Sequence, residues 1–371
     1  MADLRWPSRR LLDLLEIDLP IIQAPMAGAH GPELVAAVSA AGALGALPCA
    51  MHTPESARND VAFIRKATNR AFLMNFFCHQ IPEQNPAAQE RWRKRLAGYY
   101  AELGVEALAD AGAAMRAPFD EGLCELVEEV RPKAVSFHFG LPRENLLERV
   151  RRTGAKILSS ATTVREARHL VDKGVDAVIA QGSEAGGHRG MFLTDDVASQ
   201  IGTFALVPQI VDAVDVTVVA AGGIADGRGI AAAFALGADG VQIGTAYLRT
   251  PEARISSLHR EALRNARDED SALTNVFTGR PARSIKNRMV REVGPISADA
   301  PAFPLAVNAL MPLRAKAEAA GSGDFGPLWT GQAGPLAREI PAGELTALLA
   351  EEALDCLNFI SGNGRTEAGR H

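Results

Sequence analysis

Short apolar segments alternate with helix-like segments along most of this chain, and this alternation limits the possible folds more than any other feature. The apolar segments that we predict to be strands are Pro20–Gln23, Leu44–Leu47, Phe72–Phe77, Ala134–His138, Lys156–Leu158, Ala177–Ala180, Thr217–Ala220 and Gly240–Ile243. The helices predicted between them are Pro32–Ala41, Pro54–Ala67, Glu121–Val130, Arg143–Arg152, Val164–Lys173, Ser199–Ala213 and Gly227–Leu236. Strands that alternate with helices form a parallel sheet. Eight such repeats predict a closed (β/α)8 TIM barrel.

An open, doubly wound sheet is the alternative that the same alternation allows. In that fold, the first turn from strand to helix carries the G-x-G-x-x-G fingerprint of dinucleotide-binding proteins. Here that turn reads Ala24-Pro-Met-Ala-Gly-Ala-His30, which lacks the fingerprint. The sequence therefore favours the barrel.

Two parts of the chain break the alternation. Residues 80–112 hold a polar, amphipathic segment, Gln89–Tyr100, which we predict to be an inserted helix. After Tyr247 the chain continues with a charged helix over Pro251–Asp270 and then with a proline-rich stretch, 276–313, that has little periodicity. These insertions predict additional structure over one end of the barrel.

The resulting fold prediction is a TIM barrel with a smaller, mostly helical cap domain formed by insertions. Thr346–Cys356 is expected to lie in a closing helix, and 360–371 to be a frayed tail. The predicted boundaries are 1–78 and 113–247 for the barrel, about 336–360 for the closing helix, and 79–112 and 248–335 for the cap or substrate domain.

Composition speaks against several classes of partner. The 371 residues include 39 Lys and Arg against 44 Asp and Glu, a net charge of −5, and the chain has no long basic tract for nucleic acid. No run of about 18 apolar residues is present to span a membrane. The four cysteines form no CxxC pair, and the sequence shows no clustered zinc ligands. We expect a cytoplasmic protein, monomeric or homodimeric, with no metal.

Amide side chains stand at the ends of four predicted strands, where barrel proteins bind ligands. They are Gln23, Asn75, Gln181 and Gln242. Any one of them could simply cap its strand. Together they suit a planar ring with alternating donors and acceptors, such as an isoalloxazine, because an amide can both donate and accept.

The ends of the last two strands carry small residues in consecutive turns. Gly222 and Gly223 follow one strand, and Gly244 and Thr245 follow the next. Tight turns also require glycine. As a pair at the last two strands of a barrel, however, they indicate a phosphate site, where backbone amides complement an anion.

The loop Gln181-Gly-Ser-Glu-Ala-Gly-Gly-His-Arg-Gly190 is the strongest candidate for catalysis. It contains four glycines, which let a backbone approach a ligand closely. His188 within it is the candidate for proton transfer. His138, flanked by phenylalanines, is either a core histidine or a substrate contact. A solvated position is favoured for Arg189, and surface or helix positions for five other histidines: His30, His52, His79, His169 and His259.

The sequence resembles the nitronate monooxygenase family, formerly called 2-nitropropane dioxygenases. The resemblance extends from about residue 20 to residue 332. The matching motifs are Gln23–Gly28, Asn75–Phe77, Ser136–Pro142, Gln181–Gly190, Ala221–Ile224, Gln242–Thr245 and Leu328–Gln332. Two departures are Ile243, where the family usually has methionine, and the absence of tyrosine from residues 280–320.

The resemblance implies an FMN-dependent barrel that oxidises alkyl nitronates, notably propionate 3-nitronate, with O2 to carbonyl products and nitrite. His188 is similar to the family's catalytic histidine, and His138 is a possible substrate contact. The residues that the resemblance places at FMN are Gln23, Asn75, Gln181, Gly186, Gly222, Gly223, Gln242, Ile243, Gly244 and Thr245.

Two other functions remain open at this point. One is an NAD(P)H-dependent quinone or enoyl reductase that uses the same flavin barrel. The other is a non-redox barrel that binds a phosphate-bearing ligand, which explains the glycine turns but not the four amides at the strand ends.

Overall fold

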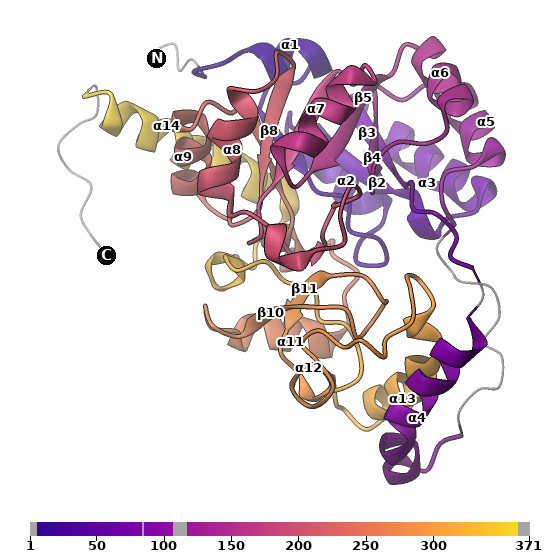
Figure 1. Cartoon of the computed structure of the whole chain (residues 1–371). Coiled ribbons are helices and arrows are strands. Elements are labelled where there is room, and N and C mark those ends of the chain that lie inside the picture. Colours follow the sequence, from indigo (N-terminus) through magenta and orange to yellow (C-terminus); the bar gives the residue numbers. More distant parts are fainter. Residues whose placement is uncertain (1–5, 84, 107–116, 363–371) are drawn as a thin grey trace.

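Eight parallel strands form the centre of the molecule. The computed structural model describes residues 6–83, 85–106 and 117–362 (Figure 1). The strands are β1 (Ile21–Gln23), β2 (Gly45–Pro48), β3 (Phe72–Phe77), β4 (Ala134–His138), β5 (Lys156–Ala161), β6 (Ala177–Gln181), β8 (Thr217–Ala221) and β9 (Gly240–Ile243). They pair in the order β1-β9-β8-β6-β5-β4-β3-β2.

The first and last strands of this order also meet, which closes the barrel. Ile22 of β1 forms a parallel bridge with Leu44, just before β2. The Gln23 N–H donates to Leu44 O at 2.9 Å, and the Leu44 N–H donates to Ile21 O at 2.9 Å. The predicted TIM barrel is confirmed, and the open-sheet alternative is wrong because no free edge separates β1 from β2.

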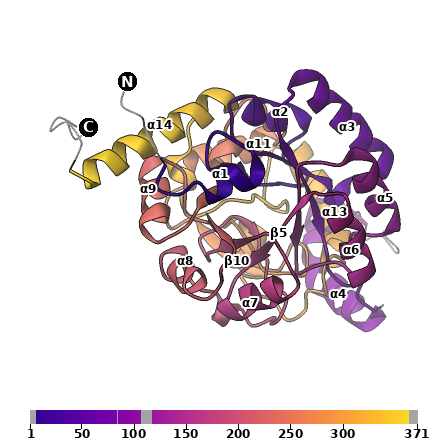
Figure 2. The same ribbon diagram turned by 90° about the horizontal axis from the view of Figure 1, so that it is seen from above.

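Helices surround the barrel, as Figure 2 shows from the end that carries α1. They are α2 (Pro32–Ala40), α3 (Pro54–Ala67), α5 (Glu121–Val130), α6 (Glu144–Arg152), α7 (Val164–Asp172), α8 (Thr203–Val211), α9 (Gly227–Ala235) and α14 (Ala342–Ile360). α8 begins four residues later than predicted. Residues 197–199 form a separate 3-10 turn, and the Glu184 carboxylate accepts from Thr203 N–H where α8 starts.

A short helix that the sequence analysis did not predict closes the amino-terminal end of the barrel. α1 (Arg10–Leu15) lies at the end opposite the cap (Figure 1). Leu11, Leu12 and Leu15 are buried in one apolar cluster with residues of the barrel interior, including Ile22, Leu44, Leu158 and Ile179. α1 therefore acts as an apolar plug, so the open end of the barrel is the carboxyl end.

The cap lies over that open end and has its own apolar core. Its helices are α4 (Pro86–Leu103), α11 (Ser257–Asn265), α12 (Arg288–Glu292) and α13 (Ala306–Ala319), with α10 (Thr245–Leu248) leading into it. Trp92 and Leu96 of α4 pack with Leu310 of α13 and with Phe277 and Phe325. The inserted helix predicted in residues 80–112 is present as α4.

The cap is more regular than the sequence suggested. The charged helix expected over Pro251–Asp270 is restricted to α11, and the stretch 276–313 contains α12 and most of α13. It also contains strand β11 (Ala282–Ile285), which pairs with β10 (Ser271–Thr274) and with β7 (Gly187–His188) in an antiparallel sheet. The predicted division into two domains stays a prediction.

The last helix of the described residues, α14, packs against α9 and α2. Most of the tail expected over 360–371, and part of the insertion at 79–112, lie outside the described residues. Among the helices that are described, none combines the length and the apolar character needed to cross a membrane.

We predict that Leu15→Ala lowers the free energy of unfolding by about 2–5 kcal/mol, because it opens a cavity in the apolar plug. Leu15 is fully buried. Urea unfolding followed by circular dichroism measures the change. Phe204→Ala is the control: Phe204 is 75% exposed, and its replacement should change stability by no more than about 0.5 kcal/mol. Equal effects of the two substitutions on stability would contradict the role of α1 as a buried apolar plug.

Candidate active site

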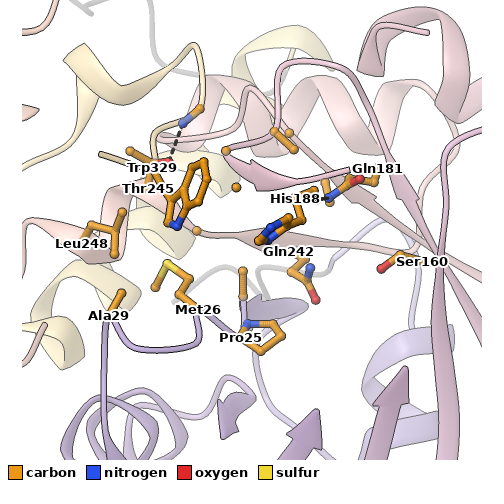
Figure 3. Close-up of a pocket in the computed structure, with 18 of the residues that line it drawn as sticks. Pro25, Met26, Ala29, Ser160, Gln181, His188, Gln242, Thr245, Leu248 and Trp329 are labelled. Carbon is orange, nitrogen blue, oxygen red and sulfur yellow. Dashed lines mark hydrogen bonds between the residues drawn. The ribbon is translucent and has the colours of Figure 1, made fainter. Parts of the chain in front are cut away.

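A cavity of about 1250 Å³, its open mouth included, lies at the carboxyl ends of the strands beneath the cap (Figure 3). The predicted site residues that line it are Asn75, His138, Gln181, Gly186, His188, Gly222, Gly223, Gln242, Gly244 and Thr245. The fold thus brings together residues from six strands.

Gln23 and Ile243, two predicted cofactor contacts, do not line this cavity. Gln23 is fully buried, and its Oε1 accepts a hydrogen bond from Ala46 N–H at 3.1 Å, while its Nε2 lies 3.1 Å from His30 Nε2. Ile243 packs in the main apolar core. Their roles at a cofactor stay predictions.

The turn after β8 requires glycine, whereas Gly244 after β9 has ordinary space around it, with Ala24 Cβ 3.5 Å from the position of an added Cβ. Gly222 and Gly223 have φ angles of 108° and 73°, in the left-handed region that favours glycine. A Cβ on Gly222 would lie 2.9 Å from Ala185 N. α10 starts immediately after Gly244, so its first amides have no acceptor within the helix. These turns present backbone donors to the cavity.

Two of the amide side chains at the strand ends differ in whether they have hydrogen-bond partners. Asn75 Nδ2 donates to Ser136 Oγ at 2.8 Å, which joins β3 to β4. Gln242 Oε1 is buried and has no hydrogen-bond partner among the described residues. Because buried polar atoms are almost always paired, this oxygen in the cavity wall indicates a ligand that donates to it.

Gln181 ties the two ends of the glycine-rich loop together. Its Nε2 donates to His188 O at 3.0 Å, and its Oε1 accepts from Gly190 N–H at 2.7 Å. Gly190 lies close to the wall, since a Cβ there would be 2.9 Å from Ser160 Cβ. One side chain at the end of β6 therefore sets the position of the residues on both sides of Arg189.

Arg189 is fully buried, so the expected solvated position is wrong. Its guanidinium donates to Gly182 O and Gln181 O, each at 2.6 Å, and to Gln200 Oε1 at 2.8 Å. Burial, assisted by the nearby cation Arg283, lowers the pKa of Arg189 to about 9. The side chain is charged at neutral pH and ties its loop to the end of β6.

His188 reaches the cavity from a strand of the cap sheet. β7 pairs with β11, with His188 opposite Ala282, and the Arg189 N–H donates to Pro281 O at 2.9 Å. The imidazole Nε2 lies 2.9 Å from Thr278 Oγ1. Phe303 and Trp329 each have ring centroids 5.3 Å from the imidazole. An imidazole in such an aromatic surround can exchange a proton with a ligand away from bulk water.

His138 bonds to the loop rather than standing free in the cavity. Burial lowers its pKa to about 3, so the ring is neutral at physiological pH. Its Nε2 lies 3.2 Å from His188 O, and its Nδ1 lies 3.0 Å from Ser160 Oγ. A carbonyl oxygen only accepts, so Nε2 carries the proton and Nδ1 accepts from Ser160. Its contact with substrate stays a prediction.

Two other histidines were expected on the surface or in helices but are buried outside helices. His30 bonds to the β1 turn, accepting from Met26 N–H at 3.2 Å. His79 packs against Phe303 with ring centroids 4.8 Å apart. His259 does lie on a helix, α11, but it lines the cavity, and its Nε2 donates to Trp329 O at 2.9 Å.

Two cap residues that contact the loop Gln181–Gly190 or its histidine could not be predicted from the sequence. Thr278 and Arg283 were not singled out, because they lie far from the loop in sequence. Arg283 Nε donates to Ser183 O at 3.0 Å. Glu184, in the same loop, uses its carboxylate to accept from Thr203 Oγ1 at 2.9 Å. Among the described residues, no group of three or more His, Cys, Asp or Glu side chains could hold a metal ion.

Together, the closed barrel and its cavity define a (β/α)8-barrel enzyme whose site opens at the carboxyl ends of the strands. Comparison with known proteins identifies the family. The family model described as "Nitronate monooxygenase" matches residues 8–352. The chain belongs to the nitronate monooxygenase family, whose members are in general flavin-dependent oxidoreductases.

Similar proteins cover nearly the full length. A nitronate monooxygenase of Paraburkholderia phytofirmans is 40% identical over 93% of this chain and 95% of that protein. A nitronate monooxygenase of Pseudomonas aeruginosa is 41% identical over 92% of this chain and 98% of that protein. Among solved structures, a nitroalkane oxidase from Streptomyces ansochromogenes aligns with a TM-score of 0.85 and 41% identity. The alignment covers 95% of this chain and 99% of the oxidase. FabK from Thermotoga maritima aligns with a TM-score of 0.73 and 28% identity, and the alignment covers 96% of this chain and 99% of FabK.

We predict that stability falls as the pH is lowered from about 6.5. Burial is the largest cause that lowers the pKa of His30 and His259 to about 4 and that of His138 to about 3. Below the unfolded value near 6.5 the unfolded chain binds these protons first. Each histidine then costs about 1.4 kcal/mol of stability per pH unit until its folded pKa is reached.

Urea midpoints measured between about pH 7.5 and about pH 5 test this effect. The midpoint should fall over this range, and His138→Gln should show a shallower fall because one of the three contributions is gone. A midpoint independent of pH, or an equal slope in the variant, would contradict the assignment.

Proposed function

We propose that this chain is an FMN-dependent monooxygenase that oxidises alkyl nitronates, such as propionate 3-nitronate, with O2 to a carbonyl product and nitrite. The observation that carries the proposal is one cavity in which glycine turns, an unsatisfied glutamine oxygen and His188 lie together. The family shared with nitronate monooxygenases over residues 8–352 supports the same reaction class.

The cavity wall fits a flavin mononucleotide. The amides after Gly222 and at the start of α10 would bind its phosphate, because they are backbone donors that follow the neighbouring strands β8 and β9. Gln242 Oε1 has no hydrogen-bond donor among the described residues, and an N–H of the flavin ring could donate to it. Asn75 and Gly186 line the same cavity and would contact the cofactor. When bound, FMN supplies the electron-accepting group, and the protein supplies position and polarity.

His188 would act on the substrate carbon or its anion. With a neutral nitroalkane, the imidazole takes the α-proton, which leaves the nitronate. With a nitronate the carbon is already deprotonated, and the imidazole then serves to hold the anion. The aromatic rings of Phe303 and Trp329 beside His188 exclude water from this exchange.

Oxygen uptake tests the proposed reaction. We expect purified flavin-containing protein to consume O2 with propionate 3-nitronate and to release nitrite in step. Failure with propionate 3-nitronate and with every other alkyl nitronate would reject the proposal. Rapid anaerobic bleaching of the flavin by NADH would instead assign a reductase, and a colourless protein that binds phosphate ligands would assign a non-redox barrel.

We predict that His188→Asn lowers kcat/KM for a neutral nitroalkane by at least about 100-fold, the usual contribution of a general base. Turnover of the matching nitronate should fall much less, because that substrate needs no deprotonation. Stopped-flow or oxygen-electrode kinetics measure both. His169→Asn, at an exposed position on α7, controls for the substitution. Equal losses with both substrates would assign His188 to substrate positioning alone.

A further inference from the structure

A hydroxyl group from the cap contacts the imidazole of His188. Thr278 is 2% exposed, and its Oγ1 lies 2.9 Å from His188 Nε2. It belongs to the turn that leads from β10 into β11, about 90 residues beyond the histidine, and β11 is the strand that pairs with β7. Besides the rings of Phe303 and Trp329, the cap therefore contacts His188 through the backbone ladder and through this side chain.

The turn that carries Thr278 is held firmly in place. Gly279 has a φ of 88°, and a Cβ on it would lie 2.0 Å from Pro301 O, so the turn packs directly against residues 301–303. The Gly279 N–H donates to Asn275 O at 2.8 Å. Phe277, on the other side, packs edge-on against Trp329 with ring centroids 5.7 Å apart. Thr278 cannot shift away from the imidazole without moving these contacts.

Thr278 has a second polar neighbour besides His188. Its Oγ1 lies 3.4 Å from Arg280 O, a carbonyl that can only accept. The hydroxyl can direct its hydrogen to that carbonyl, and its oxygen can then accept from an N–H at His188 Nε2. In that arrangement the neutral ring carries its proton on Nε2, and Nδ1 is the basic nitrogen.

We propose that Thr278 is a positioning residue that keeps His188 in the Nε2–H form, with Nδ1 as the base for neutral nitroalkanes. This inference rests on the proposed role of His188. In the step, Nδ1 takes the α-proton, the electron pair of the C–H bond stays on the substrate as the nitronate, and the ring becomes an imidazolium. Thr278 Oγ1 then accepts a stronger, charge-assisted hydrogen bond from Nε2–H.

The tautomer can be read in the unaltered protein. Ring ¹⁵N signals of histidine-labelled, flavin-containing protein distinguish Nε2–H from Nδ1–H, and the signal lost in His188→Asn assigns the residue. We expect the Nε2–H form at high pH. A proton on Nδ1 would overturn the proposal without the need for a Thr278 variant.

Variants at Thr278 test the direction of the bond. In Thr278→Val, which removes the acceptor, His188 should titrate at lower pH, because the imidazolium loses a partner. Thr278→Ser should restore the original titration. Thr274→Val is the matched control, since Thr274 is equally buried in β10 and its Oγ1 accepts from Val276 N–H. An unchanged titration in Thr278→Val, or one moved to higher pH, would overturn the proposal.

Kinetics give a second measurement on the same variants. Thr278→Val should lower kcat/KM for a neutral nitroalkane by roughly 10- to 100-fold, the effect of losing a hydrogen bond to a charged group, and should spare the nitronate. The titratable and charged groups of the surrounding aromatic cluster, His79, His138 and Arg280, are the same in every variant. Equal loss with both substrates would contradict the assignment.

The two proposals fail in different ways. Absence of nitronate oxidation by the unaltered protein would reject the proposed function. The tautomer and the titration of His188 are measured without turnover. They therefore test the positioning role of Thr278 whatever the substrate is.

Discussion

The buried guanidinium of Arg189 is the interaction on which the site depends. It donates to two carbonyl oxygens at the end of β6, while the backbone N–H of Arg189 donates to Pro281 O in the cap. A buried charge without partners would cost several kcal/mol, and these carbonyl dipoles offset that cost. Because Arg189 follows His188 directly, fixing the guanidinium also fixes the imidazole. Gln181 adds a second constraint by bonding to the residues on either side of Arg189.

The barrel and the cap supply different parts of one site. The barrel strands end in the glycine turns and the amides that fit a cofactor, and the plug of α1 leaves the carboxyl end as the open one. The cap supplies the partner strand β11 of the loop that carries His188, the hydroxyl of Thr278 and the aromatic wall of Phe303 and Trp329. We therefore place the proposed substrate chemistry at the boundary between barrel and cap, where a change in the cap sheet reaches the histidine directly.

The barrel could be predicted from the sequence because each strand is a local signal. β3, β4 and β9 have the predicted bounds, and the residues at the strand ends converge as parallel topology requires. The cap sheet could not be predicted, since β7 is two residues long and depends on a partner about 95 positions away. The burial of Arg189 was missed for a related reason: a charged residue in a glycine-rich loop is ordinarily solvated, and its carbonyl partners appear only after folding.

The central claim is that one cavity holds FMN by its phosphate at the glycine turns and presents its ring to His188. A crystal structure of the protein purified with its bound cofactor tests this most directly. The account predicts the phosphate against the amides that follow Gly222 and Gly244, a ring N–H donating to Gln242 Oε1, and the imidazole of His188 beside the ring. A phosphate bound elsewhere, or a ring that leaves Gln242 unpaired and His188 remote, would contradict it.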